Sequence, residues 1–242
     1  MSIGDAEIKT QERVIRFFKD PEILGYQYIG NLSDYQNKNI KEDRLRQYLR
    51  LKGYADKLID AAVMQLQQEA GNLSRGVYDA NKTVYSRLKY GIPVSESPGK
   101  PPVTVELIDE ANPLNNDFAI AEEVTVVEQQ EKRPDLVIYL NGIAVAVIEL
   151  KRSSISVSEG IRQNLTNQKD SFIRGFFTTM QFCMAGNESE GLRYGTLLTG
   201  EKFYMEWKDD GFKEHEEERD PVDVRISKIC EGIENKLLKQ IY

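Results

Sequence analysis

Three charged residues, Asp135, Glu149 and Lys151, border the most apolar part of the sequence. Glu149 and Lys151 follow an apolar run at 143–148, where a charged side chain without a partner is costly. Two positions apart on a strand, they project from the same face. Asp135 precedes a second apolar run at 136–140. Two carboxylates offer hard oxygen ligands to Mg²⁺, and an adjacent ammonium group can orient water or offset developing charge. This set of groups suits phosphodiester hydrolysis.

Asn141-Gly142 joins the two apolar runs and predicts a β-hairpin with a type I′ turn. The second arm is apolar on both faces, which is typical of a central strand. Regular pairing from a two-residue turn places Asp135 opposite Ile148, facing away from Glu149. The site therefore requires a bulge or twist near Pro134, or an Asp135 that lies just before regular pairing begins. The alternative is a polar strand end that simply reaches solvent.

The rest of the chain predicts a mixed α/β protein. Apolar periodicity predicts helices over residues 8–18, 41–70 (divided near Gly53), 77–88, 158–170 and 224–242. Alternation and β-branched residues predict strands over 103–108, 118–127, 194–199 and 202–207, whereas 172–184 fits either structure. We expect a helical amino-terminal region (1–90), a core that carries the site (91–208), and an acidic segment followed by a helix (209–242).

Composition narrows the chemistry. The 242 residues are 40% hydrophobic and 29% charged, as in a globular protein, and no apolar run approaches the roughly 20 residues of a membrane span. With no signal-peptide pattern at the start, we expect a cytoplasmic protein. The single histidine, His215, stands in an acidic stretch, and Cys183 and Cys230 lack a CxxC spacing. These features exclude a serine–histidine triad, a histidine-metal nuclease and a zinc site.

Charge is unevenly distributed along the chain. The net charge of −7 argues against a protein that coats DNA through bulk electrostatics. Residues 132–174 are locally basic, however, which is compatible with a phosphate-bearing substrate.

Residues 133–151 (Arg-Pro-Asp-Leu-Val-Ile-Tyr-Leu-Asn-Gly-Ile-Ala-Val-Ala-Val-Ile-Glu-Leu-Lys) resemble the nuclease signature of Type I restriction enzyme R subunits. Residues 81–94, 107–109 with 115–118, and 192–196 also resemble that family's amino-terminal region, so the likeness covers 78–207. It implies the restriction-endonuclease-like PD-(D/E)xK fold, a mixed sheet of four or five strands with helices on both faces. It also implies that Asp135 and Glu149 bind Mg²⁺ and that Lys151 assists the chemistry.

The same resemblance points to further site residues. A glutamine on the next helix supports such sites in a Q-x-x-x-Y pattern; Gln163 stands at the matching place, but Asn167 replaces the tyrosine. Gln163 is either a supporting residue or a solvated helix residue. A glutamate on the first helix sometimes joins these sites, and Glu7 and Glu12 are the candidates; each could equally be a helix-surface residue.

R subunits join a nuclease to an ATP-driven DNA translocase, yet the sequence has no phosphate-binding loop of the form G-x-x-x-x-G-K-[ST]. The nearest approach, at 186–193, lacks the lysine and hydroxyl. We therefore expect a nuclease domain that cuts double-stranded DNA without its own sequence specificity. ATP would act only through motor domains absent from this chain, and partners would be the modification and specificity subunits. The alternatives are a non-catalytic partner-docking module and a stand-alone repair-type nuclease.

Overall fold

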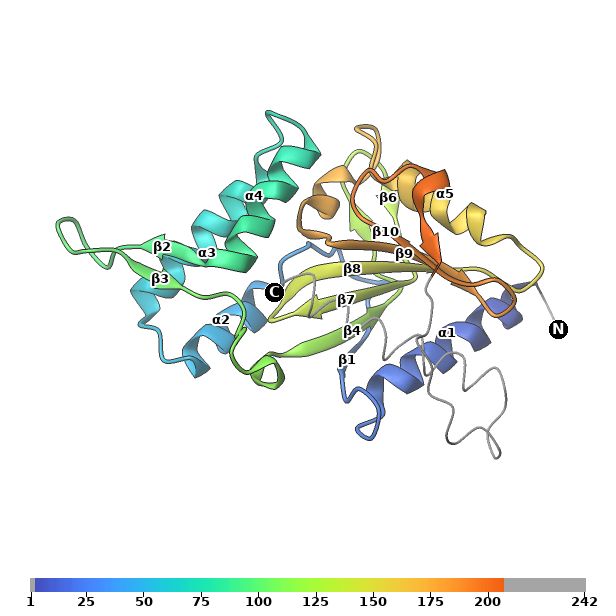
Figure 1. Cartoon of the computed structure of the whole chain (residues 1–242), viewed down its shortest axis with the longest axis horizontal. Helices are drawn as coiled ribbons and strands as arrows, with labels where there is room; N and C mark the ends of the chain where they lie inside the picture. Colours follow the sequence, from blue (N-terminus) through green and yellow to red (C-terminus); the bar gives the residue numbers. More distant parts are fainter. Residues whose placement is uncertain (1–2, 207–242) are drawn as a thin grey trace.

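A seven-stranded mixed sheet forms the centre of the fold (Figure 1). The computed structural model describes residues 3–206, with side chains from residue 8 onward. In spatial order the strands are β1 (Gln27–Asn31), β4 (Phe118–Glu122), β7 (Leu136–Leu140), β8 (Ile143–Leu150), β9 (Phe182–Asn187), β10 (Gly191–Gly195) and β11 (Met205–Glu206). The β1–β4 and β8–β9 pairs are parallel and the other pairs are antiparallel. The mixed α/β class is confirmed, but four or five strands was too few.

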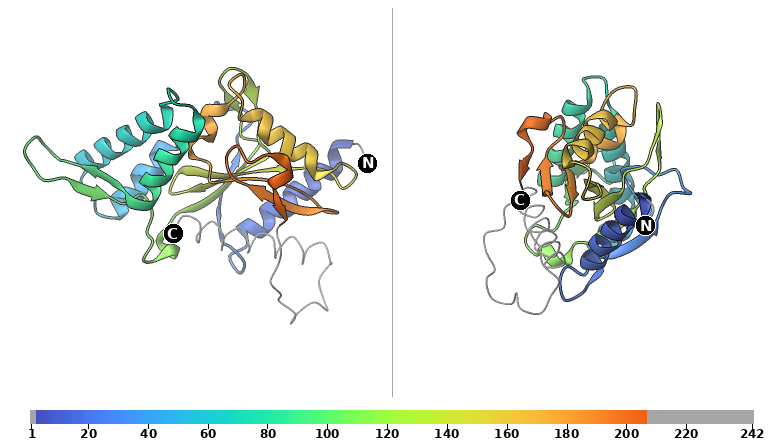
Figure 2. Two further views of the ribbon diagram at one scale, coloured as in Figure 1. Left: turned by 45° about the horizontal axis from the view of Figure 1, so that its top comes forward. Right: turned by 90° about the vertical axis from the view of Figure 1, so that its right-hand side faces the viewer.

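Helices cover both faces of this sheet. They are α1 (Ile3–Lys19), α2 (Glu42–Leu51), α3 (Asp56–Gly71), α4 (Val77–Tyr90) and α5 (Val157–Asn167), with short 3₁₀ helices η1 (Pro113–Asn115), η2 (Arg174–Thr179) and η3 (Glu201–Phe203). Figures 1 and 2 show α1 below the sheet, α5 above it, and α2, α3 and α4 grouped beside one end. Two small sheets, β2 (Ile92–Val94) with β3 (Val103–Val105) and β5 (Val126–Val127) with β6 (Glu131–Lys132), project from this body.

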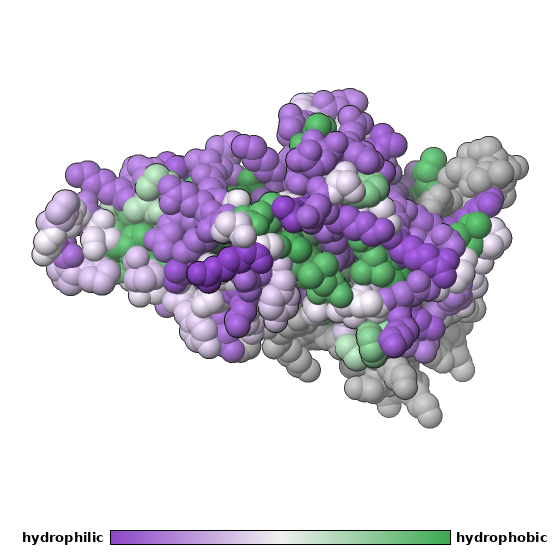
Figure 3. Space-filling view, turned by 90° about the horizontal axis from the view of Figure 1, so that it is seen from above, coloured by the Kyte–Doolittle hydropathy of each residue, from purple (hydrophilic) through white to green (hydrophobic). Residues whose placement is uncertain are grey.

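Alternate residues of β8 separate two apolar cores. Ile148 and Leu150 pack into a core with α1, α2 and α3. Val147 packs into a second core, with η2, on the opposite face. Because side chains alternate along a strand, Glu149 projects from the same face as Val147, toward α5. Seen from above, the surface is mainly hydrophilic, with apolar side chains exposed in smaller groups (Figure 3).

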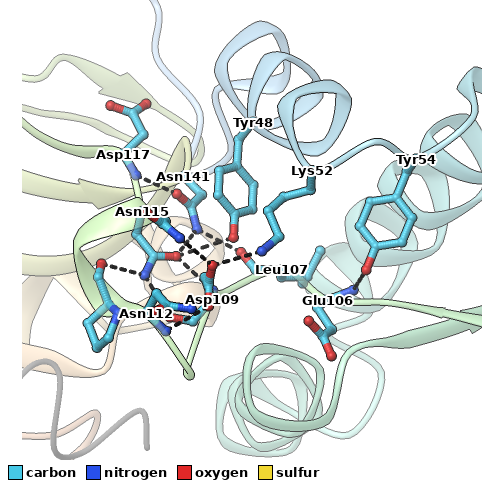
Figure 4. Close-up of polar contacts among 12 residues, drawn as sticks. Tyr48, Lys52, Tyr54, Glu106, Leu107, Asp109, Asn112, Asn115, Asp117 and Asn141 are labelled. Atoms are coloured by element: carbon cyan, nitrogen blue, oxygen red, sulfur yellow. Dashed lines mark hydrogen bonds and ion pairs between the residues drawn. The ribbon is translucent and has the colours of Figure 1, made fainter.

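The hairpin turn is as predicted. Asn141 and Gly142 have φ values of 52° and 83°, as a type I′ turn requires. The Asn141 side chain is buried in a polar cluster (Figure 4), where its Nδ2 donates to Leu107 O and Asn116 Oδ1 and its Oδ1 accepts from Asp117 N. A side chain at Gly142 would come within 2.7 Å of Lys41 O, so only glycine fits there. The turn is thus fixed by tertiary contacts as well as by local preference.

A β-bulge lies in the middle of β8. Ile138 pairs with Ala146 and Tyr139 with Ala144, so Val145 has no partner on β7. The Val145 carbonyl instead accepts a hydrogen bond of 2.7 Å from Gln181 N. The bulge that the site requires therefore exists, but it lies at Val145 and not near Pro134, where it was predicted. The other predicted arrangement, with Asp135 just before regular pairing begins, is also present, since β7 starts at Leu136.

Other local predictions had mixed outcomes. The first three predicted helices are α1, the α2–α3 pair divided around Gly53, and α4. β1 was not predicted, and the expected strand at 194–199 is mostly a loop that follows β10. Segment 172–184 contains η2 followed by the start of β9. His215, Cys230, the acidic segment and the predicted helix at 224–242 lie outside the described residues. Within residues 3–206, no helix is long and apolar enough to cross a bilayer.

Candidate active site

The bulge brings Asp135 and Glu149 to the same face of the sheet. Leu136 pairs with Ile148, so the residues that precede and follow this pair, Asp135 and Glu149, stand opposite each other across the two strands. Asp135 Oδ2 accepts a hydrogen bond of 2.6 Å from the backbone N–H of Leu150. This bond fixes the aspartate against the strand that carries Glu149.

Glu149 is fully buried, with 0% of its surface exposed. Its Oε2 accepts a hydrogen bond of 2.6 Å from Gln163 Nε2, while Oε1 is buried and has no hydrogen-bond partner. Burial raises the pKa of Glu149 well above its ordinary value, and the negative charge of Asp135 raises it further, against the lowering effect of Lys151. A shared proton or a bound cation would relieve the repulsion between two carboxyl groups placed in this way.

Lys151 completes the predicted trio. Its Nζ lies 4.0 Å from Asp135 Oδ2, and it donates a hydrogen bond of 3.0 Å to Leu150 O. The Lys151 side chain is 15% exposed, so the ammonium group stands at the edge of the site with access to solvent. Its backbone N–H donates to Gly186 O over 2.9 Å, which keeps β8 and β9 paired up to the lysine.

Gln163 reaches Glu149 from α5, which packs closely on the sheet. At Gly160, one helical turn before Gln163, an added Cβ would lie 2.9 Å from Ala185 Cβ and 3.5 Å from Glu149 Cβ. Glycine at this position therefore allows α5 to approach near enough for the glutamine to bond the carboxylate. Asn167, in the place of the family tyrosine, is buried, and its backbone carbonyl accepts a hydrogen bond from Ile173 N. Among the described side chains, no hydrogen bond joins Asn167 to Asp135 or Glu149.

Glu123 is a neighbour of the site that was not predicted from the sequence. Its charge raises the pKa of Glu149, although burial and Asp135 have larger effects. Glu123 has a φ of 51°, which is uncommon for a residue other than glycine, and its N–H donates to Asp135 O over 2.9 Å. Arg133 forms an ion pair with its carboxylate, and Gln11 of α1 donates to it. It had no signal in the sequence, because Glu123 falls inside the strand predicted over 118–127, whereas β4 ends at Glu122.

Glu7 and Glu12 were the two candidate glutamates on the first helix. Glu12 is exposed on α1 and lines a hollow with Tyr28 and Glu122. α1 instead contacts the surroundings of the site through Gln11. The side chain of Glu7 lies outside the described residues.

The donor set fits a hard divalent cation. Glu149 Oε1 is a buried oxygen without a hydrogen-bond partner, and the negative charge of the Asp135 carboxyl acts on the Glu149 carboxyl. In the part of the chain that the structure describes, no group of three or more His, Cys, Asp or Glu side chains could hold a metal. A cation here would thus have two protein carboxylates and take its other oxygens from water or substrate, as Mg²⁺ commonly does.

The basic residues near the site are largely paired. Arg133 pairs with Glu123, Arg162 with Glu159 and Glu201, and Arg174 with Asp170. Lys132 lies over the ring of Phe172, 4.9 Å from its centre. Three of the four arginines in the locally basic stretch at 132–174 therefore have a carboxylate partner, which offsets part of their positive charge.

Comparison with known proteins identifies the family. The family model described as "Type I restriction enzyme R protein N terminus" matches residues 7–203. The chain belongs to this family. A Type I restriction enzyme endonuclease subunit (SsaAORF53P) of Staphylococcus saprophyticus is 29% identical over 112 residues, which cover 44% of this chain and 12% of that subunit. The match thus spans about an eighth of the curated relative, and the R-subunit resemblance expected from residues 133–151 is confirmed at the family level.

Proposed function

We propose that this chain is a Mg²⁺-dependent endonuclease domain that hydrolyses phosphodiester bonds of double-stranded DNA without sequence specificity of its own. The observation that carries the proposal is the buried, unpartnered Oε1 of Glu149 beside the Asp135 carboxyl, with the Lys151 ammonium 4.0 Å from Asp135. A sheet end built only for stability would gain by replacing this pair of repelling carboxylates with apolar residues.

Each residue has a distinct role in this proposal. Asp135 and Glu149 would hold the metal, which when bound supplies polarisation of the scissile phosphate and activation of water. Leu150 N–H fixes the Asp135 carboxylate, and Gln163 fixes that of Glu149, so both ligands are oriented before a cation arrives. The Lys151 ammonium orients the attacking water or offsets the charge that develops on the phosphate.

We further propose that the domain acts within a Type I restriction enzyme. The relative's name describes an endonuclease subunit, and the matched region is a small part of it. An ATP-driven motor elsewhere in such a subunit would deliver DNA, and modification and specificity subunits would supply recognition. The paired basic residues around the site agree with this division, because a delivered substrate needs little binding from the nuclease itself.

The test is cleavage of plasmid DNA by the complete enzyme with Asp135→Ala, Glu149→Ala or Lys151→Ala. Each variant should abolish cleavage and leave ATP hydrolysis unchanged. Glu159→Ala, on the exposed side of α5, is the matched control and should cut normally. Normal cleavage by any of the three variants would refute the role of that residue.

Two further outcomes separate this proposal from its alternatives. Unassisted cutting of plasmid by this chain alone would indicate a stand-alone nuclease. Binding of Mn²⁺ that Glu149→Ala does not alter would indicate a scaffold without a catalytic metal site.

A further inference from the structure

The turn between β9 and β10 is organised around Asn187. This side chain is 6% exposed, and its Oδ1 accepts hydrogen bonds from Ser189 N (3.1 Å) and Glu190 N (2.6 Å). Such bonds from an asparagine to the backbone two and three residues later close a tight turn. Asn187 therefore closes its own turn through Oδ1, which leaves its Nδ2 to donate both to Glu190 Oε1 (3.3 Å) and outside the turn.

The same turn holds the segment that connects Lys151 to α5. Asn187 Nδ2 donates to Ile155 O over 2.7 Å, and Ser189 Oγ donates to Ser153 O over 2.9 Å. The Glu190 carboxylate accepts from Val157 N at the first turn of α5, over 3.0 Å. The segment at 152–156 has no regular secondary structure, so these contacts supply much of its order.

Both ends of this segment carry groups of the proposed site. Lys151 stands at one end, and α5, which carries Gln163, begins at the other. Asp135 is held by the strands alone, whereas Glu149 is held by its strand and by the hydrogen bond from Gln163. A change in the segment would thus move the ammonium group and the supporting glutamine more than it would move the two carboxylates.

We propose that Asn187 is a positioning residue, which fixes the 152–156 segment so that Lys151 and Gln163 are aligned with the carboxylate pair. This inference rests on the proposed nuclease function. Displacements of about 1 Å in groups that act on the substrate cost roughly a hundredfold in rate, so one lost hydrogen bond can matter for turnover without unfolding the protein.

The experiment compares Asn187→Asp with the unaltered protein. Aspartate keeps the Oδ1 acceptor that closes the turn, but replaces the donor to Ile155 O with an oxygen that repels both this carbonyl and the Glu190 carboxylate. We expect DNA cleavage by the complete enzyme to fall by about 10- to 100-fold. Mn²⁺ affinity, measured by calorimetry on the full 242-residue chain, should fall by a clearly smaller factor than cleavage, since the strands that carry the two carboxylates are unchanged and only the support of Glu149 by Gln163 is weakened.

Asn72→Asp is the matched control. Asn72 Oδ1 accepts from Ser74 N in a similar turn on the surface, and cleavage should be normal. Asn187→Ser provides a second variant, because a serine hydroxyl can also close the turn but is too short to reach Ile155 O; it should reproduce the loss of cleavage if the aspartate variant fails to fold.

Two results would overturn the inference. One is normal cleavage by the folded Asn187 variants. The other is a parallel loss of Mn²⁺ binding and cleavage, which would indicate general destabilisation. If Glu149→Ala abolishes cleavage while the Asn187 variants cut normally, only the positioning role fails; if Glu149→Ala cuts normally, the nuclease proposal itself fails.

Discussion

Glu149→Gln should make the metal-free protein more stable. The Glu149 carboxyl is fully buried, has one oxygen without a partner and meets the charge of Asp135. Glutamine has nearly the same shape, keeps an oxygen for Gln163 Nε2 and offers an N–H₂ group to the Asp135 carboxylate. Leaving a buried polar group unsatisfied costs about 1–3 kcal/mol, so relief of this cost should increase the free energy of unfolding by about 2 kcal/mol.

The measurement is thermal unfolding at neutral pH in a chelating buffer. For a domain of about 200 residues, 2 kcal/mol corresponds to a rise in Tm of about 4–8 °C. Adding Mg²⁺ should stabilise the unaltered protein and not the variant, since glutamine is a poorer ligand than carboxylate. Glu159→Gln, an exposed glutamate paired with Arg162 on α5, is the control and should change Tm little.

The effect has a defined pH dependence. The pKa of Glu149 in the folded protein is raised above the ordinary value of 4.5, so the folded state binds the proton more tightly than the unfolded state. Stability of the unaltered protein is then lost as pH rises from 4.5 through the raised pKa. The advantage of glutamine should therefore grow over this range and disappear below it. An equal or lower Tm for Glu149→Gln at neutral pH, in the absence of metal, would refute the electrostatic reasoning.

Two other predictions concern the metal and the helix. Affinity for Mn²⁺ should rise with pH above 4.5, by up to about tenfold per pH unit where binding displaces one proton, and should level off beyond the raised pKa of Glu149. Calorimetry in two buffers of different ionisation enthalpy would detect the displaced proton. An affinity that does not change with pH would argue against a proton on the carboxyl pair. Gly160→Ala should destabilise the protein by about 1–3 kcal/mol, because the new Cβ meets Ala185 Cβ at 2.9 Å, and should also slow cleavage by moving Gln163 away from Glu149. Gly71→Ala, where nothing lies within 4 Å, is its control in the same Tm measurement, and equal effects of the two changes would contradict the packing argument.

Local chemistry made the hairpin and its charged end predictable. Asn141 and Gly142 favour positive φ whatever surrounds them, and an uninterrupted apolar run beside such a turn is typical of a buried strand. Charged residues at the end of such a strand stood out because burial is costly for them. The position of Gln163 could be predicted only from the family pattern, since a glutamine on a helix has no distinctive local signal.

Features that depend on distant contacts could not be predicted. The bulge at Val145 is stabilised by Gln181 N, and the neighbouring Ala144 N donates to Asn39 O, in a segment far earlier in the chain. β1 is a mostly polar edge strand containing Gly30, without the alternation that indicates a strand, and it forms by pairing with β4. Glu123 lies near the site because of an unusual backbone conformation, which its residue type does not favour.

The unpaired residue Val145 also explains the spacing of the two acidic residues in the sequence. Around a two-residue turn, partners in a regular hairpin are separated by an odd number of positions, as Leu140 and Ile143 are by three. Asp135 and Glu149 are fourteen positions apart, an even number, so they can face each other only if one strand holds an odd number of unpaired residues. In related chains with the same turn, even spacing between two facing acids therefore identifies a bulged hairpin, and odd spacing identifies a regular one.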